Sequence, residues 1–177
     1  GAWLLQVTGT SAGPDNPGVG YCFGDGSGAP CPCGNNNDGS LAGAGCANGA
    51  HASGALLTGS GTASVTGDDV VLTCTGLDPN NTGLYFQADN AVNGGQGSTF
   101  GDGLRCAGGA LVRLQIRTSD ASGTSSTTLP IGTLGSVLPG DTKRYQCWYR
   151  DTSGNQPCGA GVNDFNLSNG YEITWLP

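Results

Sequence analysis

The sequence contains no methionine, and it has a single lysine, a single histidine and a single glutamate: Lys143, His51 and Glu172. Charged residues make up 11% of the chain, against ~25% in an average protein. With six cations and a net charge of −7, the chain lacks the clustered basic residues that bind phosphate backbones, which excludes nucleic-acid binding. No apolar run approaches the roughly 18 residues of a membrane-spanning helix. Glutamate and lysine are also too scarce for a helical bundle.

Glycine is the residue that is over-represented. The chain of 177 residues has the size of one domain, and 34 of them are glycine. This is about 19%, against ~7% in an average protein. The glycines do not recur at every third position, so a collagen helix is excluded. A hydrophobic fraction of 36% together with eight cysteines argues against intrinsic disorder.

The eight cysteines predict four disulfide bonds. Their number is even, and no two CxxC pairs occur as in a zinc site. Cys31 and Cys33 are too close in the chain to bond each other. Disulfides form in oxidising compartments, and a chain without methionine has lost its initiator. We therefore expect a secreted, extracellular or cell-surface protein whose signal peptide was removed before Gly1.

Three segments can be distinguished along the chain. Residues 1–10 form an N-terminal strand or arm, in which Trp3, Leu5 and Val7 would share one face at period two. Residues 11–20 are rich in proline and glycine and are interpreted as a linker. The remainder, 21–177, is predicted to be a β-sandwich domain. It opens with a cysteine-rich knot at 22–46, where glycine, asparagine and aspartate replace apolar residues.

The segments after the knot predict an all-β fold. Short β-prone stretches separated by turn residues lie at 55–58, 62–66, 69–75, 83–88, 110–117, 144–150 and 171–176. Seven such strands without any helical periodicity indicate a disulfide-stapled antiparallel β-sandwich, either jelly-roll or Ig-like, with a loop-rich N-terminal knot.

Two of these strands alternate clearly in hydrophobicity. In 110–117, the pattern places Val112, Leu114 and Ile116 on one face, and the intervening arginines and glutamine on the other. In 144–150, Tyr145, Cys147 and Tyr149 oppose Arg144, Gln146, Trp148 and Arg150. The pattern therefore predicts that the two tyrosines share one face, and either face could be the one that packs on the core.

From about Tyr21 to its end, the sequence resembles a known family. The resembling stretches are CFGDGSG at 22–28, CPCGNN at 31–36, FGDGLRCAGG at 100–109, YQCWYRD at 145–151 and FNLSNG at 165–170. They are similar in order and spacing to a β domain that recurs at the C-terminus of secreted planctomycete proteins. The family has no established function, so the resemblance implies no catalytic or binding residue.

The resemblance does imply a disulfide pairing. Similar domains lack cysteines at positions 74 and 147, which implies that this extra pair forms a bond, Cys74–Cys147. Cys106–Cys158 then follows as the natural second pair. Shorter relatives keep two cysteines of the knot that resemble Cys33 and Cys46, which implies the bonds Cys33–Cys46 and Cys22–Cys31.

Catalytic chemistry has little support in the sequence. Nucleophilic catalysis needs a nucleophile, a base and an orienting group, and His51 lies alone among small residues in a stretch typical of a loop. Glycosidases need two facing carboxylates, and Glu172 lies on a strand where we expect it to face solvent or an arginine. The sequence thus predicts no catalytic residue, and we expect that the protein is not an enzyme.

Calcium is the one cofactor that the loops could hold. Oxygen ligands occur in turn-rich segments at Asp15, Asp38, Asp68, Asp69 and Asp89, but none has the spacing of an EF-hand loop. Aspartates beside glycine, asparagine and serine usually close turns through their own side chains. We therefore favour turn formation over a metal site and predict no metal.

Three further residues are candidates for ligands or glycans. Trp148 lies on the polar face of its strand, where it could support a ligand, stack on Arg150 or contact another subunit; burial in the core is the alternative. Asn80 and Asn166 begin the sequons Asn80-Asn81-Thr82 and Asn166-Leu167-Ser168.

These observations lead to a functional hypothesis. An apolar N-terminal strand must pair somewhere, either within its own domain or with a neighbouring copy. Donation to a neighbour generates a filament, because head-to-tail contacts of this kind do not close. We therefore expect a structural subunit of an extracellular filament or surface assembly, with Trp3, Leu4, Leu5 and Val7 as the donated strand. The alternative is a secreted carbohydrate-binding or adhesion module with a polysaccharide as its partner.

Overall fold

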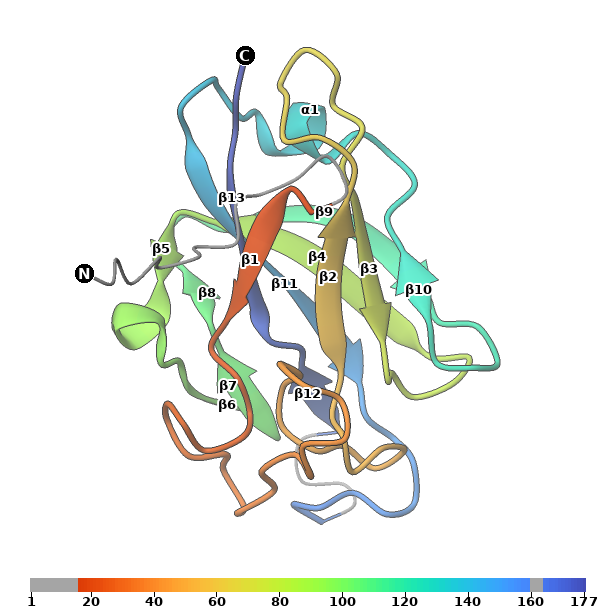
Figure 1. Cartoon of the computed structure of the whole chain (residues 1–177). Helices are drawn as coiled ribbons and strands as arrows, with labels where there is room; N and C mark the ends of the chain where they lie inside the picture. The colour runs from red at the N-terminus through yellow and green to blue at the C-terminus, as the bar shows by residue number, and fades with distance from the viewer. Residues whose placement is uncertain (1–15, 160–163) are drawn as a thin grey trace, which may run out of the picture.

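A computed structural model describes residues 16–159 and 164–177, and they form an almost entirely β structure (Figure 1). The strands are β1 (Gly18–Tyr21), β2 (Leu56–Ser60), β3 (Val71–Thr75), β4 (Thr82–Ala88), β5 (Asn90–Ala91), β6 (Ser98–Phe100), β7 (Gly103–Arg105), β8 (Ala107–Gly108), β9 (Val112–Thr118), β10 (Ser125–Ser126), β11 (Thr142–Arg150), β12 (Phe165–Leu167) and β13 (Gly170–Thr174). The helical elements among the described residues are a 3-10 turn, η1 (Val92–Gly95), and one helical turn, α1 (Ile131–Gly135).

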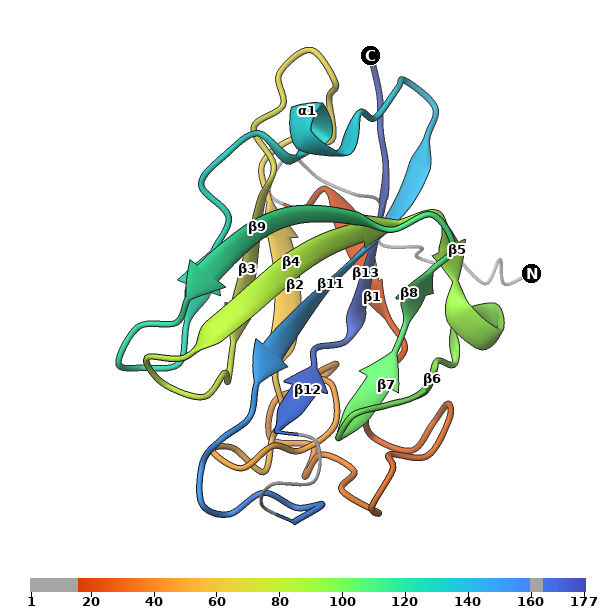
Figure 2. The ribbon, with the colours of Figure 1, turned by 180° about the vertical axis from the view of Figure 1, so that it is seen from behind.

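The strands build two facing layers. The larger sheet has the order β1-β13-β11-β4-β9, with β12 pairing with β11 beyond the end of β13. The smaller sheet has the order β10-β3-β2 and lies in front of the larger one in Figure 1, whereas β9, β4 and β11 face the viewer in Figure 2. The pairs β5-β8 and β6-β7 add two short hairpin-like sheets. All named strand pairs are antiparallel, so the predicted all-β, sandwich-like fold is confirmed.

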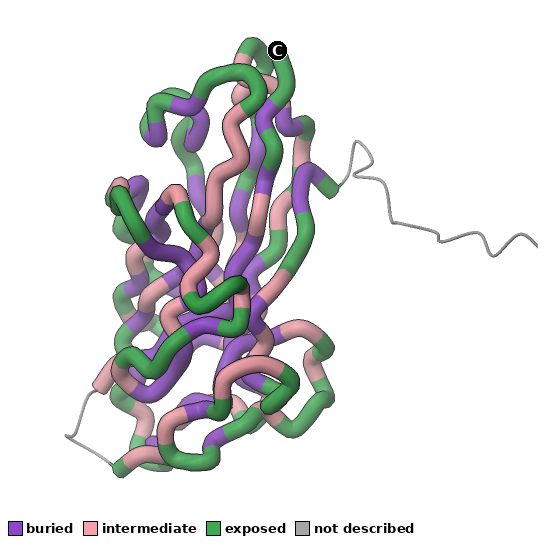
Figure 3. Tube along the Cα trace, turned by 90° about the vertical axis from the view of Figure 1, so that its left-hand side faces the viewer, coloured by how far each residue is buried: buried purple, intermediate pink, exposed green. Residues whose placement is uncertain are grey.

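The core lies between the two layers, where the buried stretches of Figure 3 concentrate. Tyr145, Cys147 and Tyr149 of β11 all point into it, which confirms the alternation predicted for that strand. The polar atoms of the aromatic core residues are hydrogen-bonded to one another. Trp175 Nε1 donates to Tyr145 Oη over 2.9 Å, and Tyr145 Oη donates to Gln87 Oε1 over 3.0 Å. Buried hydroxyls are thereby satisfied without solvent.

Two of the predicted segments differ from the structure, and a third lies outside the described residues. Residues 62–66 form no strand and contribute only the isolated bridge between Ser64 and Leu176. Strand β1 covers 18–21, so the predicted linker at 11–20 is wrong over residues 18–20, which pair with β13 instead. The glycines there allow β1 to approach its neighbours closely, since a Cβ on Gly18 would lie 2.2 Å from the carbonyl oxygen of Glu172. Residues 1–15, including the predicted donor strand, lie outside the described residues.

The predicted alternation of β9 is wrong because of a β-bulge. Opposite β4, Tyr85 pairs with Gln115 but Phe86 pairs with Arg113, so Leu114 is an extra residue in the register. Because of this extra residue, the alternation of side chains between the two faces changes phase at Leu114. Residues of β9 before Leu114 therefore alternate out of step with those after it. Leu114 is buried in the core, whereas Ile116 is 71% exposed on the outer face of the sheet.

Three disulfides are formed, and all three differ from the expected pairs. They join Cys22 to Cys106, Cys31 to Cys46 and Cys33 to Cys158, so the pairs Cys22–Cys31, Cys33–Cys46 and Cys106–Cys158 are wrong. The reason is spatial: only one of the three bonds closes the knot on itself, and the other two join it to Cys106 and Cys158 in the rest of the domain. Tyr21, for example, donates from its hydroxyl to the carbonyl of Cys106 over 3.1 Å, which places Cys22 beside β7 and β8.

The predicted Cys74–Cys147 bond is not formed. Both cysteines are buried free thiols, one on β3 and the other on β11, so they face each other across the two layers. Burial and the neighbouring Cys147 thiol raise the pKa of the Cys74 thiol. The sequence therefore identified two neighbouring residues correctly, but not their oxidation state in this structure.

Candidate functional site

One candidate site is a groove of about 400 Å³ on the outer face of the large sheet, called the outer groove below. Its floor is formed by Leu84 and Phe86 of β4, which lies between β11 and β9 (Figure 2). Ile116 of β9 borders one side and Trp148 of β11 the other. The exposed ring of Phe100 extends the wall at the β6-β7 turn. The groove therefore presents a continuous apolar surface to solvent.

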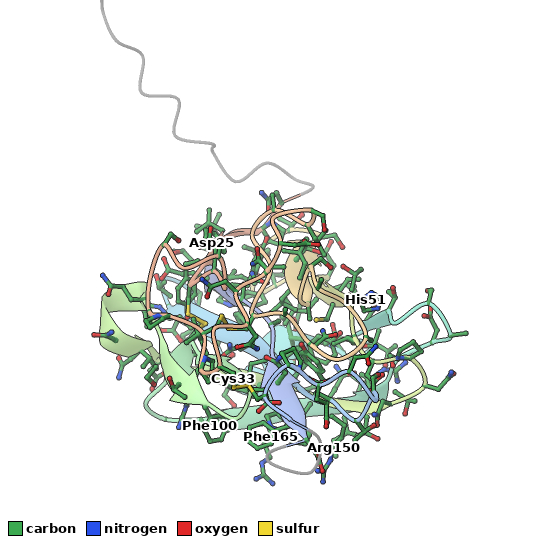
Figure 4. All side chains as sticks on the ribbon, turned by 90° about the horizontal axis from the view of Figure 1, so that it is seen from below. Asp25, Cys33, His51, Phe100, Arg150 and Phe165 are labelled. Carbon is green, nitrogen blue, oxygen red and sulfur yellow. A yellow bond between two sulfur atoms is a disulfide. The ribbon has the colours of Figure 1, made fainter. Side chains whose placement is uncertain are left out.

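A row of stacked side chains forms one wall of the outer groove, and we call it the arginine–aromatic ladder. The guanidinium of Arg150 lies 5.4 Å from the ring centre of Trp148, and Trp148 lies 5.6 Å from Phe165. Phe165 contacts Phe100 at 5.2 Å, and Arg105 lies 6.0 Å above the Phe100 ring. Figure 4 shows Phe100, Phe165 and Arg150 gathered on one side of the molecule. Each end of the ladder thus carries a positive charge held by cation–π contact.

Glycines of the second Phe-Gly-Asp-Gly stretch explain why the ladder forms. Gly101 has a φ of +60°, and a Cβ there would lie 2.2 Å from the Phe165 ring. A Cβ on Gly103 would lie equally close to Asn166 Oδ1. The β6-β7 turn can therefore lie flat against β12 only because both positions lack a side chain. This turn also carries Phe100 to the wall of the groove.

The residues predicted as ligand or glycan sites have different environments. Trp148 lies at the outer groove and stacks on Arg150, one of the arrangements expected for it. Asn166 is fully buried, and its amide donates to the carbonyl of Ala47 over 3.0 Å, so it is not accessible for glycosylation in this fold. Asn80 is exposed in a turn with a φ of +55° and remains a candidate.

A second candidate site lies on the opposite side, between the edges of the two sheets, and is called the seam groove. Residues of β1 and β2, two strands that lie side by side in Figure 1, line it, and neither strand has a main-chain partner on its groove side among the described residues. Its lining includes Val19, Phe23, Gly43 and Leu56, and no charged side chain contributes to it. Val19 is 47% exposed there. A neutral, apolar groove beside a strand edge is suited to an extended apolar segment.

Two side chains of the C-terminal region close the bottom of the seam groove. The Asn169 amide accepts a hydrogen bond from the Leu57 N–H over 2.7 Å and donates to the Leu57 carbonyl over 3.2 Å. The Tyr171 hydroxyl accepts from the Gly18 N–H and donates to Asn16 Oδ1 over 2.6 Å. Side chains therefore satisfy Leu57 on the edge of β2 and the N–H of Gly18 at the start of β1, and the rest of β1 is the edge that an added strand could use.

The aspartates considered as calcium ligands have other roles where they are described. Asp38 closes a turn with Ser40, and Asp69 accepts from the N–H of Thr62. Asp68 accepts from two N–H groups at the start of α1, and Asp89 pairs with Lys143 at 2.8 Å. Within 16–159 and 164–177 no three acidic, histidine or cysteine side chains are grouped as metal ligands, and Asp15 lies outside this range.

Buried acids lie where the knot meets the end of β11. Burial raises the pKa of Asp151 to about 6, the Gly49 N–H partly opposes this, and the nearby charges of Asp102 and Asp78 add to the increase. The Gly49 N–H donates to Asp151 Oδ1 over 2.9 Å. For Asp78, burial also favours the neutral form, but hydrogen bonds from Ser153 and its neighbours lower the pKa overall. Asp151 thereby links the segment that follows the knot, at Gly49, to the end of β11.

His51 and Glu172 have structural environments. The His51 ring is half-buried against Gly123, and its Nε2 has no hydrogen-bond partner among the described residues. Glu172 pairs with Arg144 at 2.8 Å, as expected from its position on the strand. Neither residue is accompanied by a nucleophile in a shared hydrogen-bonded group within the described chain.

Sequence reasoning missed most of the outer groove. The β6-β7 turn brings Phe100 and Arg105 to it, and the β-bulge in β9 sets the position of Arg113. Neither a turn nor a bulge can be recognised from hydrophobic periodicity. The repeated Phe-Gly-Asp-Gly stretch was the one signal that marked the turn beside Phe100.

The chain matches no protein-family model, no curated protein and no solved structure. The resemblance to the planctomycete domain therefore stays a prediction. The three disulfides indicate that the chain matures in an oxidising setting. None of the helices within the described residues is long and apolar enough to cross a membrane.

Proposed function

We propose that the protein is a secreted structural subunit that polymerises outside the cell, with residues 3–7 of one copy occupying the seam groove of the next. The observation that carries this proposal is the seam groove itself, an uncharged groove beside β1, which is the edge strand of the large sheet. The first eight residues of the chain likewise contain no charged side chain. Groove and segment are therefore complementary in polarity.

The geometry of strand addition supports the same pairing. A strand next to β1 forms main-chain hydrogen bonds and directs alternate side chains to one face. Trp3, Leu5 and Val7 would then face the groove together, next to Val19 and Leu56. The exposed Val19 would be covered in the assembly, which burial of apolar surface favours.

The position of the described chain allows exchange between copies. Asn16, the first described residue, lies in the lining of the seam groove. The eight residues 8–15 span up to about 28 Å when extended, so residues 3–7 can reach a neighbouring subunit. Because each copy then gives one strand and receives another, the assembly is an open filament.

The test replaces single residues of the donor strand in the full chain. Leu5→Asp places a charge on the groove-facing side and should abolish sedimenting polymers and filaments in electron micrographs. Gln6→Asp adds the same charge on the opposite face of the strand and should leave assembly intact. Deletion of residues 1–10 should act like Leu5→Asp.

Mixing two defective variants separates donation between copies from pairing within one copy. Val19→Asp damages the acceptor and keeps the donor, whereas Leu5→Asp does the reverse. A mixture of the two should form dimers that cannot grow, seen by size-exclusion chromatography with light scattering. Polymers of Leu5→Asp that match those of the wild type would refute the proposal, and so would a mixture that stays monomeric.

A further inference from the structure

The outer groove has a charge opposite to that of the whole protein. The chain has a net charge of −7, yet Arg105 and Arg113 line the groove, Arg150 stacks on its Trp148, and no acidic residue contributes to the lining. The ion pairs of the described residues use only Lys143 and Arg144. Three arginines around one groove are thus without an acidic partner in the part of the chain that is described. Such an arrangement favours an anionic ligand.

The arginines are positioned by the fold. The bulge in β9 moves Arg113 to the outer face, where it pairs with Phe86 of the groove floor. Arg105 stacks on Phe100 and donates from Nε to the carbonyl of Ala107 over 3.2 Å. Within residues 16–159 and 164–177 its terminal NH2 groups have no hydrogen-bond or ion-pair partner, so they can contact a ligand, and the fixed side chain loses little freedom on binding.

The floor of the groove narrows the ligand class further. Both edges of β4 are already paired, with β11 and β9, so a peptide lying over it cannot add main-chain hydrogen bonds. A nucleic acid would need many phosphate contacts, which three arginines on an acidic protein do not supply. An acidic sugar offers a carboxylate for arginine together with a C–H face for the apolar floor of Leu84 and Phe86.

We propose that the outer groove binds a carboxylated polysaccharide of the polyuronate class, with Arg105 and Arg113 contacting sugar carboxylates. The seam groove takes no part in this binding. A filament of such subunits would present one polysaccharide site per copy and bind the polymer multivalently. The two proposals nevertheless stand on different surfaces, so either can fail alone.

The test measures binding of oligogalacturonate to the full chain carrying Leu5→Asp, by calorimetric titration at low salt. Arg105→Ala and Arg113→Ala should each weaken binding about tenfold, because each removes a charge-assisted contact. Lys143→Ala removes one positive charge from an ion pair outside the groove and should leave binding unchanged. Arg113→Lys should fall between wild type and alanine, since lysine cannot bind a carboxylate in a bidentate manner.

Three comparisons decide the outcome. Neutral dextran oligomers should not bind, and added salt should weaken oligogalacturonate binding. Thermal unfolding of each variant checks that the fold is intact. Absence of oligogalacturonate binding would overturn the proposal, as would equal binding by the arginine variants. Polyglutamate that binds as tightly, with the same loss in Arg113→Ala, would assign the groove to an acidic peptide instead.

Discussion

Between the two sheets, large aromatic residues supply the packing. Trp175, Tyr85, Tyr145 and Tyr149 are fully buried there, and their polar atoms bond to each other, to β10 or to the loop residue Asn48. In the knot at 22–46, the chain is instead held in place by disulfides and by hydrogen bonds from asparagine amides. The amide of Asn35, for example, donates to the carbonyls of Ala47 and Asp102 over 2.9 and 2.8 Å.

The difference teaches how a glycine-rich segment can be fixed without a core. A loop with few apolar side chains gains little from burial, so its carbonyls must find donors and its chain entropy must be reduced. Asparagine supplies two donors from one side chain, and Asn37 donates to both Ala44 and Gly45. Cross-links then limit the unfolded state. The two regions should therefore respond differently to the same kind of damage.

The largest effect is expected in the sandwich. Trp175→Ala removes a fully buried ring and leaves Tyr145 without its donor, so we expect a loss of about 3–5 kcal/mol in the free energy of unfolding. Urea denaturation followed by circular dichroism measures it. The neighbouring Leu176 is 57% exposed, and Leu176→Ala should change stability by less than about 0.5 kcal/mol. Equal effects of the two substitutions would contradict the core described above.

Removing disulfides should affect the knot next most strongly. The Cys33–Cys158 bond joins residues 125 apart, whereas Cys31–Cys46 joins residues 15 apart. In the chain-entropy model, a typical disulfide contributes about 2–4 kcal/mol, and this long loop exceeds the short one by roughly 2 kcal/mol. We therefore expect the double variant Cys33→Ser with Cys158→Ser to unfold at lower urea concentration than Cys31→Ser with Cys46→Ser. The reverse order would show that native contacts in the knot outweigh loop entropy.

The regular strands of the fold could be predicted from the sequence, and the irregular features could not. β11 alternates over its full length, so the shared face of Tyr145 and Tyr149 was predicted correctly, and the structure shows that this face is the buried one. The sequence of β9 alternates just as regularly, so its periodicity gives no sign that Leu114 is an extra residue in the register. A bulge depends on the register with the partner strand, which is a tertiary property.

The disulfides failed as predictions for a related reason. Pairing was inferred from which cysteines occur together in similar domains, and this says nothing about how the knot lies in space. Cys22 follows β1, which pairs at the edge of the large sheet and carries the cysteine to Cys106. The outer groove was missed because Ile116 reaches it through that bulge and Phe100 reaches it through the β6-β7 turn. Only Trp148, on a regular strand, was identified as a candidate in advance.

The smallest predicted effect concerns the junction between the two regions. The pKa of Asp151 rises from an ordinary 3.8 to about 6 in the folded protein, so the folded state prefers the neutral acid. The neutral carboxyl therefore favours the folded protein. This contribution to stability is fully present below the unfolded pKa and is lost as pH rises through about 6, where the carboxyl ionises in the folded protein. Asp151→Asn keeps an oxygen acceptor for the Gly49 N–H and cannot ionise. Above pH 6 it should therefore be more stable than the wild type by on the order of 2 kcal/mol.

The pH dependence distinguishes this cause from a packing effect. About one pH unit below 3.8 the Asp151 carboxyl is neutral in both the folded and the unfolded protein, so the advantage of Asp151→Asn should disappear there. Urea unfolding of both proteins from this acidic range up to pH 8 measures the difference. Asp38→Asn is the matched control, because Asp38 is exposed in a turn of the knot and hydrogen bonds from Ser40 lower its pKa. That variant should not gain stability as pH rises. If the free energy of unfolding differs between Asp151→Asn and the wild type by the same amount at every pH, ionisation of Asp151 does not cause the difference.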